Sequence, residues 1–110
     1  MEISLFSQSL FALNLEEAIE ATAQIGFPAI ELACGPPHLD LTTARSGAAA
    51  VAARIERAGL RVSCLSCFNG FTERARLDGE VQAAVEYIRL AGLFGSRTVK
   101  LTPGRPASAE

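Results

Sequence analysis

Three copies of one short pattern decide the fold of this 110-residue chain. They are Gly26-Phe27-Pro28-Ala29-Ile30-Glu31-Leu32, Gly59-Leu60-Arg61-Val62-Ser63-Cys64-Leu65 and Gly95-Ser96-Arg97-Thr98-Val99-Lys100-Leu101. In each copy a glycine and two spacer residues separate an amphipathic stretch from a short apolar run. The glycines are 33 and then 36 residues apart. A period of this size is typical of a repeated supersecondary unit, and here the unit is a strand followed by a helix.

The repeat predicts an α/β chain of parallel strands that alternate with helices. The strands are expected at residues 2–7, 29–33, 62–68 and 98–101. Strands that are separated by one helix each are expected to run parallel. The length of the chain indicates one domain, which we assign to residues 1–104, and residues 105–110 are expected to form a loose tail.

Each predicted helix carries its own start and stop signals. The first starts at Asn14, with a carboxylate three residues on as in a capping box, and stops at Gly26. The others run from Thr42 or Thr43 to Gly59 and from near Asp78 to Gly92 and Gly95. Helical spacing predicts three buried stripes: Leu15, Ala18, Ile19, Thr22 and Ile25; Ala44, Ala48, Val51, Ile55 and Ala58; and Val81, Ala84, Val85, Ile88 and Ala91. The Thr22 hydroxyl is expected to bond back to the carbonyl one turn earlier.

Bulk composition argues against two classes of partner. A net charge of −2 provides no basic surface for nucleic acid, and no apolar run approaches the roughly 20 residues of a membrane span. The start of the chain lacks the basic and apolar segments of a signal peptide, which favours a cytoplasmic location. Three cysteines, an odd number, are consistent with reduced thiols in that compartment.

Two architectures use this repeat, the (β/α)₈ barrel and the open doubly wound sheet. Nucleotide-binding open sheets usually place a glycine-rich turn after the first strand, and residues 7–14 contain no glycine. Glu31 and Lys100 each stand between two apolar residues of a strand, whereas strands of an open parallel sheet are nearly unbroken apolar runs. Both charges would then point into a barrel interior. Because alternate strands fill the same interior layer, Glu31 and Lys100 are predicted to meet.

At this point the sequence resembles a known family, the xylose isomerase-like barrels, which include sugar phosphate isomerases and epimerases. The resemblance covers nearly the whole chain in the right order and spacing. It is carried by Ile3-Ser4-Leu5-Phe6, Leu15-Glu16-Glu17-Ala18, the stretch from Gly26 to Leu32, Gly35-Pro36-Pro37-His38, Val62-Ser63-Cys64-Leu65-Ser66-Cys67-Phe68 and Val99-Lys100-Leu101. A full barrel takes about 250 residues, so the chain corresponds to the first three and a half units of a TIM barrel, a half-barrel.

The resemblance implies metal-dependent isomerisation or epimerisation of a sugar or sugar phosphate. A divalent metal (Mn, Mg, Co or Zn) would polarise the carbonyl beside which a proton or hydride moves. In this family the metal ligands lie near strand ends of the second half of the barrel. The 110-residue chain alone is therefore expected to bind no metal and to be inactive.

Five residues at or after the predicted carboxyl ends of the strands are candidates for substrate binding, because barrel active sites form there. They are Phe6, Glu31, His38, Asn69 and Lys100. Each also has a structural interpretation: barrel packing for Phe6, an ion pair for Glu31 and Lys100, a solvent-exposed loop position for His38, and a turn with the following glycine for Asn69. No catalytic residue and no metal ligand is assigned.

The stretch Cys64-Leu65-Ser66-Cys67 has the spacing of a redox or zinc motif, but it falls within a predicted strand. Residues three apart in a strand face opposite sides of the sheet. Cys64 and Cys67 are therefore not expected to share a metal or a disulfide, and Cys34 adds no second motif. Buried small apolar side chains are the favoured interpretation.

Two alternatives to an enzyme fragment remain. The first is a non-catalytic half-barrel that self-associates, because the first and last strands would be unpaired edges. This alternative predicts a homo-oligomer that is held together through its sheet edges. The second is a small open α/β binding domain.

Overall fold

Strands and helices alternate along the chain as the repeat predicts. The computed structural model describes residues 2–106, without the side chains of Thr43 and Ala44. Its strands and α-helices are β1 (Ser4–Phe6), α1 (Leu15–Ile25), β2 (Ala29–Cys34), α2 (Leu41–Arg57), β3 (Arg61–Cys67), α3 (Leu77–Leu93) and β4 (Val99–Leu101), with short 3-10 turns at Ser7–Leu10 and Arg74–Arg76. The four strands form one sheet in the order β1-β2-β3-β4, and every neighbouring pair is parallel.

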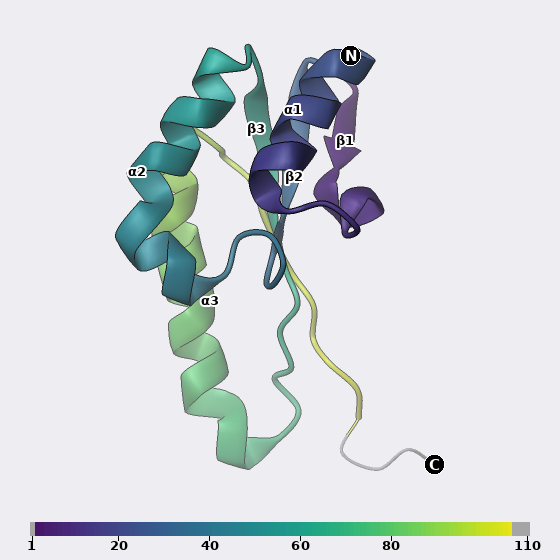
Figure 1. Cartoon of the computed structure of the whole chain (residues 1–110). Coiled ribbons are helices and arrows are strands. Elements are labelled where there is room, and N and C mark those ends of the chain that lie inside the picture. The colour runs from purple at the N-terminus through teal and green to yellow at the C-terminus, as the bar shows by residue number, and fades with distance from the viewer. Residues whose placement is uncertain (1, 107–110) are drawn as a thin grey trace.

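One face of the sheet carries the core. Its strand residues include Ile30, Leu32, Val62 and Leu65, and they pack against residues of all three helices, such as Ile19, Ile55 and Tyr87. Helices α2 and α3 contact each other, and α1 contacts β2 and α2 (Figure 1). The opposite face carries no helix within residues 2–106. This one-sided covering is the arrangement of part of a barrel, so the predicted half-barrel fold is confirmed.

The predicted start and end of α1 are confirmed. The Asn14 side chain accepts the backbone N–H of Glu17 at 2.9 Å, and the Glu17 carboxylate accepts the N–H of Asn14 at 3.1 Å. Gly26 ends the helix in the left-handed region, with φ +105°. The Thr22 hydroxyl donates to the Ala18 carbonyl at 2.7 Å, so this polar residue fits a buried stripe as expected.

The predicted start of α2 is wrong by two or three residues. The helix begins at Leu41 rather than after Thr42 or Thr43. The reason is a short bridge between Leu39 and Cys34, which brings the loop back beside the sheet and delivers the chain to the helix early. The predicted burial of Ala44 lies outside the described side chains. The end of α2 and the turn at Gly59, with φ +77°, agree with the prediction.

Part of the predicted burial is also wrong. Ile25 is 63% exposed, and Val81, Val85 and Ile88 are exposed as well, although Ala84 and Ala91 are buried as predicted. The buried side of α3 centres on Tyr87, whose hydroxyl donates to the Leu39 carbonyl at 3.4 Å. Helix α3 thus carries two apolar stripes. The pattern alone does not say which of the two packs on the sheet.

A bulge in β3 sets the register of the sheet. Ile30 pairs with Val62 but Glu31 pairs with Cys64, so Ser63 is an extra residue. Its hydroxyl lies 2.6 Å from the Ser4 hydroxyl and also donates to the Ile30 carbonyl at 3.3 Å. After the bulge the two strands pair residue by residue again, and the last pair is Cys34 with Cys67.

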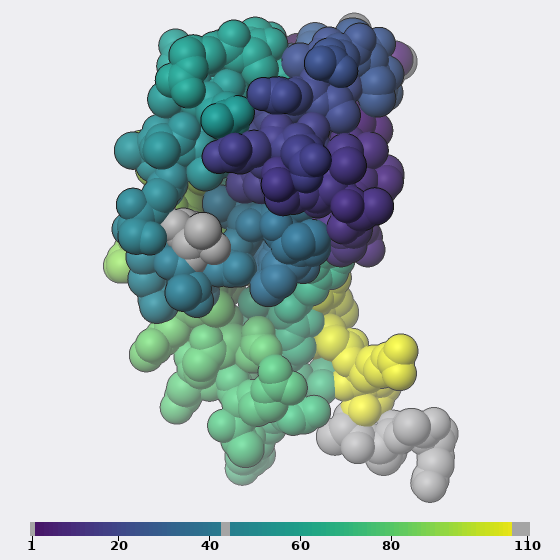
Figure 2. Space-filling model, viewed as in Figure 1, coloured from purple at the N-terminus to yellow at the C-terminus, as the bar shows by residue number. Residues whose placement is uncertain are grey.

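The carboxyl ends of the strands lie at one end of the molecule. There the first turns of α3 and the segment after β4 project together from the body (Figure 2). The two segments touch, since the N–H of Phe71 donates to the Pro103 carbonyl at 2.8 Å. A Cβ on Gly104, whose φ is +92°, would lie 2.7 Å from the Cα of Gly70, so this close approach requires a glycine.

Candidate functional site

Glu31 and Lys100 form an ion pair on the face of the sheet that the helices leave open. The Nζ atom of Lys100 lies 3.7 Å from a carboxylate oxygen of Glu31. The two residues come from β2 and β4, with β3 between them, so the predicted meeting across alternate strands is confirmed. The Lys100 side chain is 52% exposed and the Glu31 side chain 25% exposed. The pair is therefore accessible to a ligand, and its own contribution to stability is small.

Two aromatic rings lie beside this pair. Phe6 is opposite Glu31 in the sheet register, and Lys100 Nζ is 5.0 Å from the centre of the Phe6 ring, a cation–π distance. The rings of Phe6 and Phe68 stack with their centres 6.5 Å apart. Half of the Phe68 surface is exposed. A carboxylate, an ammonium group and an open apolar surface thus lie together at the carboxyl ends of the strands.

The Cys64 thiol borders the same cluster. Cys64 is opposite Glu31 in the sheet and is absent from the core that contains Cys67, so the prediction that the two cysteines face opposite sides is confirmed. Burial raises the pKa of the Cys64 thiol, and the nearby Glu31 carboxylate raises it further. The thiol is therefore neutral near pH 7 and a weak nucleophile.

His38 lies in a buried polar site of its own. It is 3% exposed, so the structural interpretation of an exposed loop histidine is wrong. Its Nε2–H donates to the Leu13 carbonyl at 3.1 Å, which leaves Nδ1 to accept from the Ser7 hydroxyl at 2.9 Å. The Ser7 oxygen in turn accepts the N–H of Ala33 at 2.9 Å. Both ring nitrogens hold protein groups together, and substrate contact by His38 stays a prediction.

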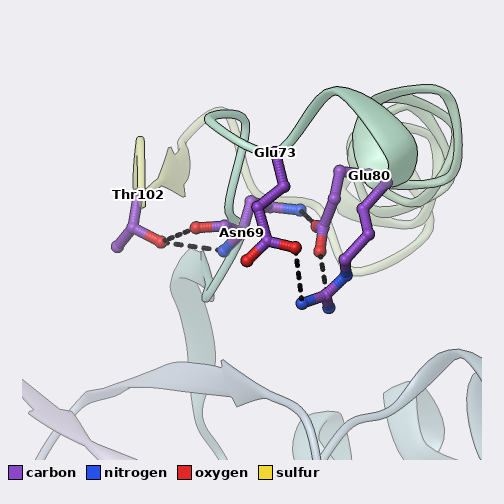
Figure 3. A network of polar contacts seen from close by, with 5 residues as sticks. Asn69, Glu73, Glu80 and Thr102 are labelled. Carbon is purple, nitrogen blue, oxygen red and sulfur yellow. Dashed lines mark hydrogen bonds and ion pairs between the residues drawn. The ribbon is translucent and has the colours of Figure 1, made fainter. Parts of the chain in front are cut away.

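Asn69 is the centre of a second polar network, which joins the end of β3 to β4 and α3 (Figure 3). Its backbone N–H donates to the Thr102 hydroxyl at 2.8 Å, and that hydroxyl donates to the Asn69 carbonyl at 2.7 Å. Its side-chain NH₂ donates to a Glu80 carboxylate oxygen at 3.1 Å. Because a carboxylate only accepts, this bond fixes which way the amide points. Asn69 therefore does more than form the turn that the sequence suggests.

The remaining amide oxygen of Asn69 has no hydrogen-bond partner among the described residues. The same holds for the Ser66 hydroxyl, three residues earlier on β3. Both atoms are buried, and residues 102–106 lie against the loop after Asn69. Because the Asn69 amide oxygen is buried, its predicted contact with substrate also stays a prediction.

Glu80, Arg76 and Glu73 extend this network to the surface. The Arg76 guanidinium lies 3.4 Å from Glu80 and 3.9 Å from Glu73 (Figure 3). A cavity of about 420 Å³ opens beside it. The cavity is lined by Gly70, Thr72, Glu73, Arg76, Arg105 and Pro106. Glu80 and Thr102 are not among the site residues predicted from the sequence. Their positions in the first turn of α3 and just after β4 are the signal that would have found them.

Two further observations concern metal binding and membrane spans. Among the side chains that the structure describes, no three His, Cys, Asp or Glu residues are close enough to hold a metal ion. In the same part of the chain, none of the helices has the length and apolar character needed to cross a bilayer.

The fold resembles that of a solved enzyme. The crystal structure of the probable 3-DHS dehydratase AsbF from Bacillus anthracis, which is involved in petrobactin synthesis, matches 92% of this chain with a TM-score of 0.69. The two sequences are 14% identical, and the match covers 38% of AsbF. AsbF belongs to the xylose isomerase-like barrel superfamily. No protein-family model and no curated protein matches the sequence.

Proposed function

We propose that this chain supplies one wall of the substrate site of a sugar-processing barrel enzyme. The observation that carries the proposal is the cluster of Phe6, Glu31 and Lys100 at the carboxyl ends of the strands. A carboxylate accepts hydrogen bonds from sugar hydroxyls, an aromatic ring packs against the C–H face of a sugar, and an ammonium group pairs with a phosphate or carboxylate substituent. The location agrees with the face at which barrel enzymes bind substrates.

Among sugar reactions, isomerisation or epimerisation is our first choice and dehydration the second. The first rests on the sequence resemblance, and the second on the name of AsbF. A divalent metal belongs to the first reaction. The side chains that the structure describes form no ligand set for it, so we assign no step to a metal here. We expect that the purified 110-residue chain does not turn over a sugar, with or without added Mn²⁺, Mg²⁺, Co²⁺ or Zn²⁺.

Binding can be tested on the chain as it is. A ¹⁵N-labelled sample is titrated with a ketose and with its phosphate ester, and amide shifts are followed by NMR. Shifts are expected around Phe6, Glu31 and Lys100, and they should be larger for the ester because of the ammonium group. Phe6→Leu and Lys100→Met should weaken them several-fold. Arg45→Met, which breaks an exposed ion pair with Glu86 between α2 and α3, is the matched control. Shifts confined to other regions, or unaltered in both site variants, would rule the proposal out.

A second candidate function is assembly with a further copy of the chain. Within residues 2–106, β1 pairs only with β2 and β4 only with β3, so each has an open edge. Helix α3 also carries an exposed apolar stripe made of Leu77, Val81, Val85 and Ile88. Arg45 of α2 contacts α3 at Glu86, on a different side of the helix from the stripe. Open edges and this stripe together favour self-association.

A further inference from the structure

Cys34 and Cys67 form a pair of thiols that takes no part in the proposed sugar site. They are the last residues of β2 and β3 and lie opposite each other in the parallel register. Both belong to the core between the sheet and the helices, so their side chains lie on the same face. Both are buried, and both are free thiols. Neighbouring strands are about 4.8 Å apart, and a disulfide joins Cα atoms that are roughly 4.4–6.8 Å apart.

The two thiols differ chemically. The neighbouring Cys34 thiol lowers the pKa of Cys67. Cys67 in turn, together with burial, raises the pKa of Cys34. The Cys34 thiol donates to the Leu32 carbonyl at 3.8 Å, and the lowered pKa of Cys67 makes it the sulfur that more readily carries negative charge. A cysteine that is oxidised and then resolved needs a second thiol nearby, and the register places Cys34 opposite Cys67.

We propose that Cys34 and Cys67 are an oxidation site at which hydrogen peroxide produces a disulfide between β2 and β3. In the first step the Cys67 thiolate attacks one peroxide oxygen. An S–O bond forms, the O–O bond breaks, and the departing hydroxide is protonated to water. In the second step the Cys34 sulfur, which loses its proton, attacks the sulfenic sulfur of Cys67. The S–S bond forms and the second oxygen leaves as water, so two thiols and one peroxide yield one disulfide and two waters.

Cys64 does not compete for this reaction. It lies on the opposite face of β3, beside Glu31, and its pKa is raised by burial. Cys64 therefore serves as an internal control for the oxidation, because it is also a thiol on β3 but its side chain faces away from Cys34.

The disulfide would tie together the strand ends that lead to the candidate site. Cys34 is followed by the loop that contains His38, and Cys67 is followed directly by Phe68 and Asn69. A disulfide on the face of the sheet that packs against the helices would thereby restrict the segment after β3. That segment carries Phe68, which stacks on Phe6, and Asn69, which bonds to Glu80 and Thr102.

The experiment uses the purified, reduced chain and hydrogen peroxide. After quenching, free thiols are alkylated in denaturant and the protein is digested with trypsin. Cleavage after Arg45, Arg61 and Arg74 places Cys34 in residues 1–45 and both other cysteines in residues 62–74. We expect one cross-linked pair of these peptides, two hydrogens lighter than their sum, and fragmentation should place the bond on Cys67. The cross-link should persist in Cys64→Ser, be absent from Cys67→Ser, and disappear with dithiothreitol.

Three results would overturn the proposal. They are retention of all three free thiols at excess peroxide, accumulation of sulfinic acid without a cross-link, and a cross-link that involves Cys64. Fragmentation of the wild-type peptides identifies the bonded sulfur directly, so the outcome does not depend on whether Cys67→Ser folds. None of these three results bears on sugar binding, which the NMR titration tests separately.

Discussion

Lys100 on β4 touches both Glu31 on β2 and the ring of Phe6 on β1, at 3.7 Å from the carboxylate oxygen and 5.0 Å from the ring centre. One ammonium group thus bridges three of the four strands across the uncovered face.

We expect the coupling free energy between Glu31 and Lys100 to be modest. A double-mutant cycle with Glu31→Gln and Lys100→Met, measured by urea unfolding, should yield about 0.2–1 kcal/mol and shrink in high salt. A coupling well above this range that is insensitive to salt would mean that the pair is shielded from solvent.

The capping box of α1 offers a sharper test of stability. Asn14→Ala removes the acceptor of the Glu17 N–H and should lower the free energy of unfolding by about 1 kcal/mol. Asn14→Asp retains an acceptor and should lose much less. Both variants are compared with the wild type by chemical denaturation that is followed by circular dichroism. Equal losses in the two variants would show that the cap is not what Asn14 contributes.

Replacing His38 should have a larger effect than its position in a loop suggests. His38→Ala leaves the Leu13 carbonyl without its donor and the Ser7 hydroxyl without its acceptor in a buried site. We expect a loss of roughly 1–3 kcal/mol, together with faster hydrogen exchange of the Ala33 amide. Ser7→Ala should have part of the same effect. A His38→Ala variant with wild-type stability would mean that water takes over both bonds.

Self-association should depend on the exposed stripe of α3. The wild-type chain is expected to form dimers or larger species at micromolar concentration by light scattering. Val81→Glu together with Ile88→Lys should shift the population towards monomer. Ile25→Glu, at an exposed apolar position on α1, is the control and should leave it unchanged. A monodisperse wild-type monomer would count decisively against assembly.

The thiols should react in a definite order as pH rises. The neighbouring Cys34 thiol lowers the pKa of Cys67, whereas burial raises the pKa of Cys64. The reactive thiolate exists above each pKa, so peroxide-driven cross-linking should survive to a lower pH than alkylation of Cys64 does. Rates of both reactions are measured between about pH 6 and 10, around the ordinary thiol pKa of about 8.5. The opposite order would mean that Cys67 is not the more acidic of the two thiols.

The repeat was enough to predict the strand–helix alternation, the parallel sheet and the meeting of Glu31 with Lys100, because each follows from periodicity and strand order. Side-chain burial on α3 was harder to predict. The helix has two apolar stripes, and only the packing of Tyr87 on the sheet selects one. The environment of His38 depends on Ser7 and Leu13, which are more than 20 residues away, and no local pattern encodes such a contact.

The bulge at Ser63 determines which face of the sheet each later residue of β3 lies on. If Ser63 paired with Glu31 instead of bulging, the register that begins at Ile30 and Val62 would continue unbroken, and Ser66 rather than Cys67 would stand opposite Cys34. Straightening the bulge in this way, with Ser63 kept, would exchange the two faces of the distal half of β3, whereas deleting Ser63 would leave the observed pairs in place. With the bulge straightened, the apolar Leu65 and the thiol of Cys67 would turn towards the interior of the barrel, and Cys64 and Ser66 towards the helices. The bulge at Ser63 thus decides which residues of this strand face a ligand and which face the core.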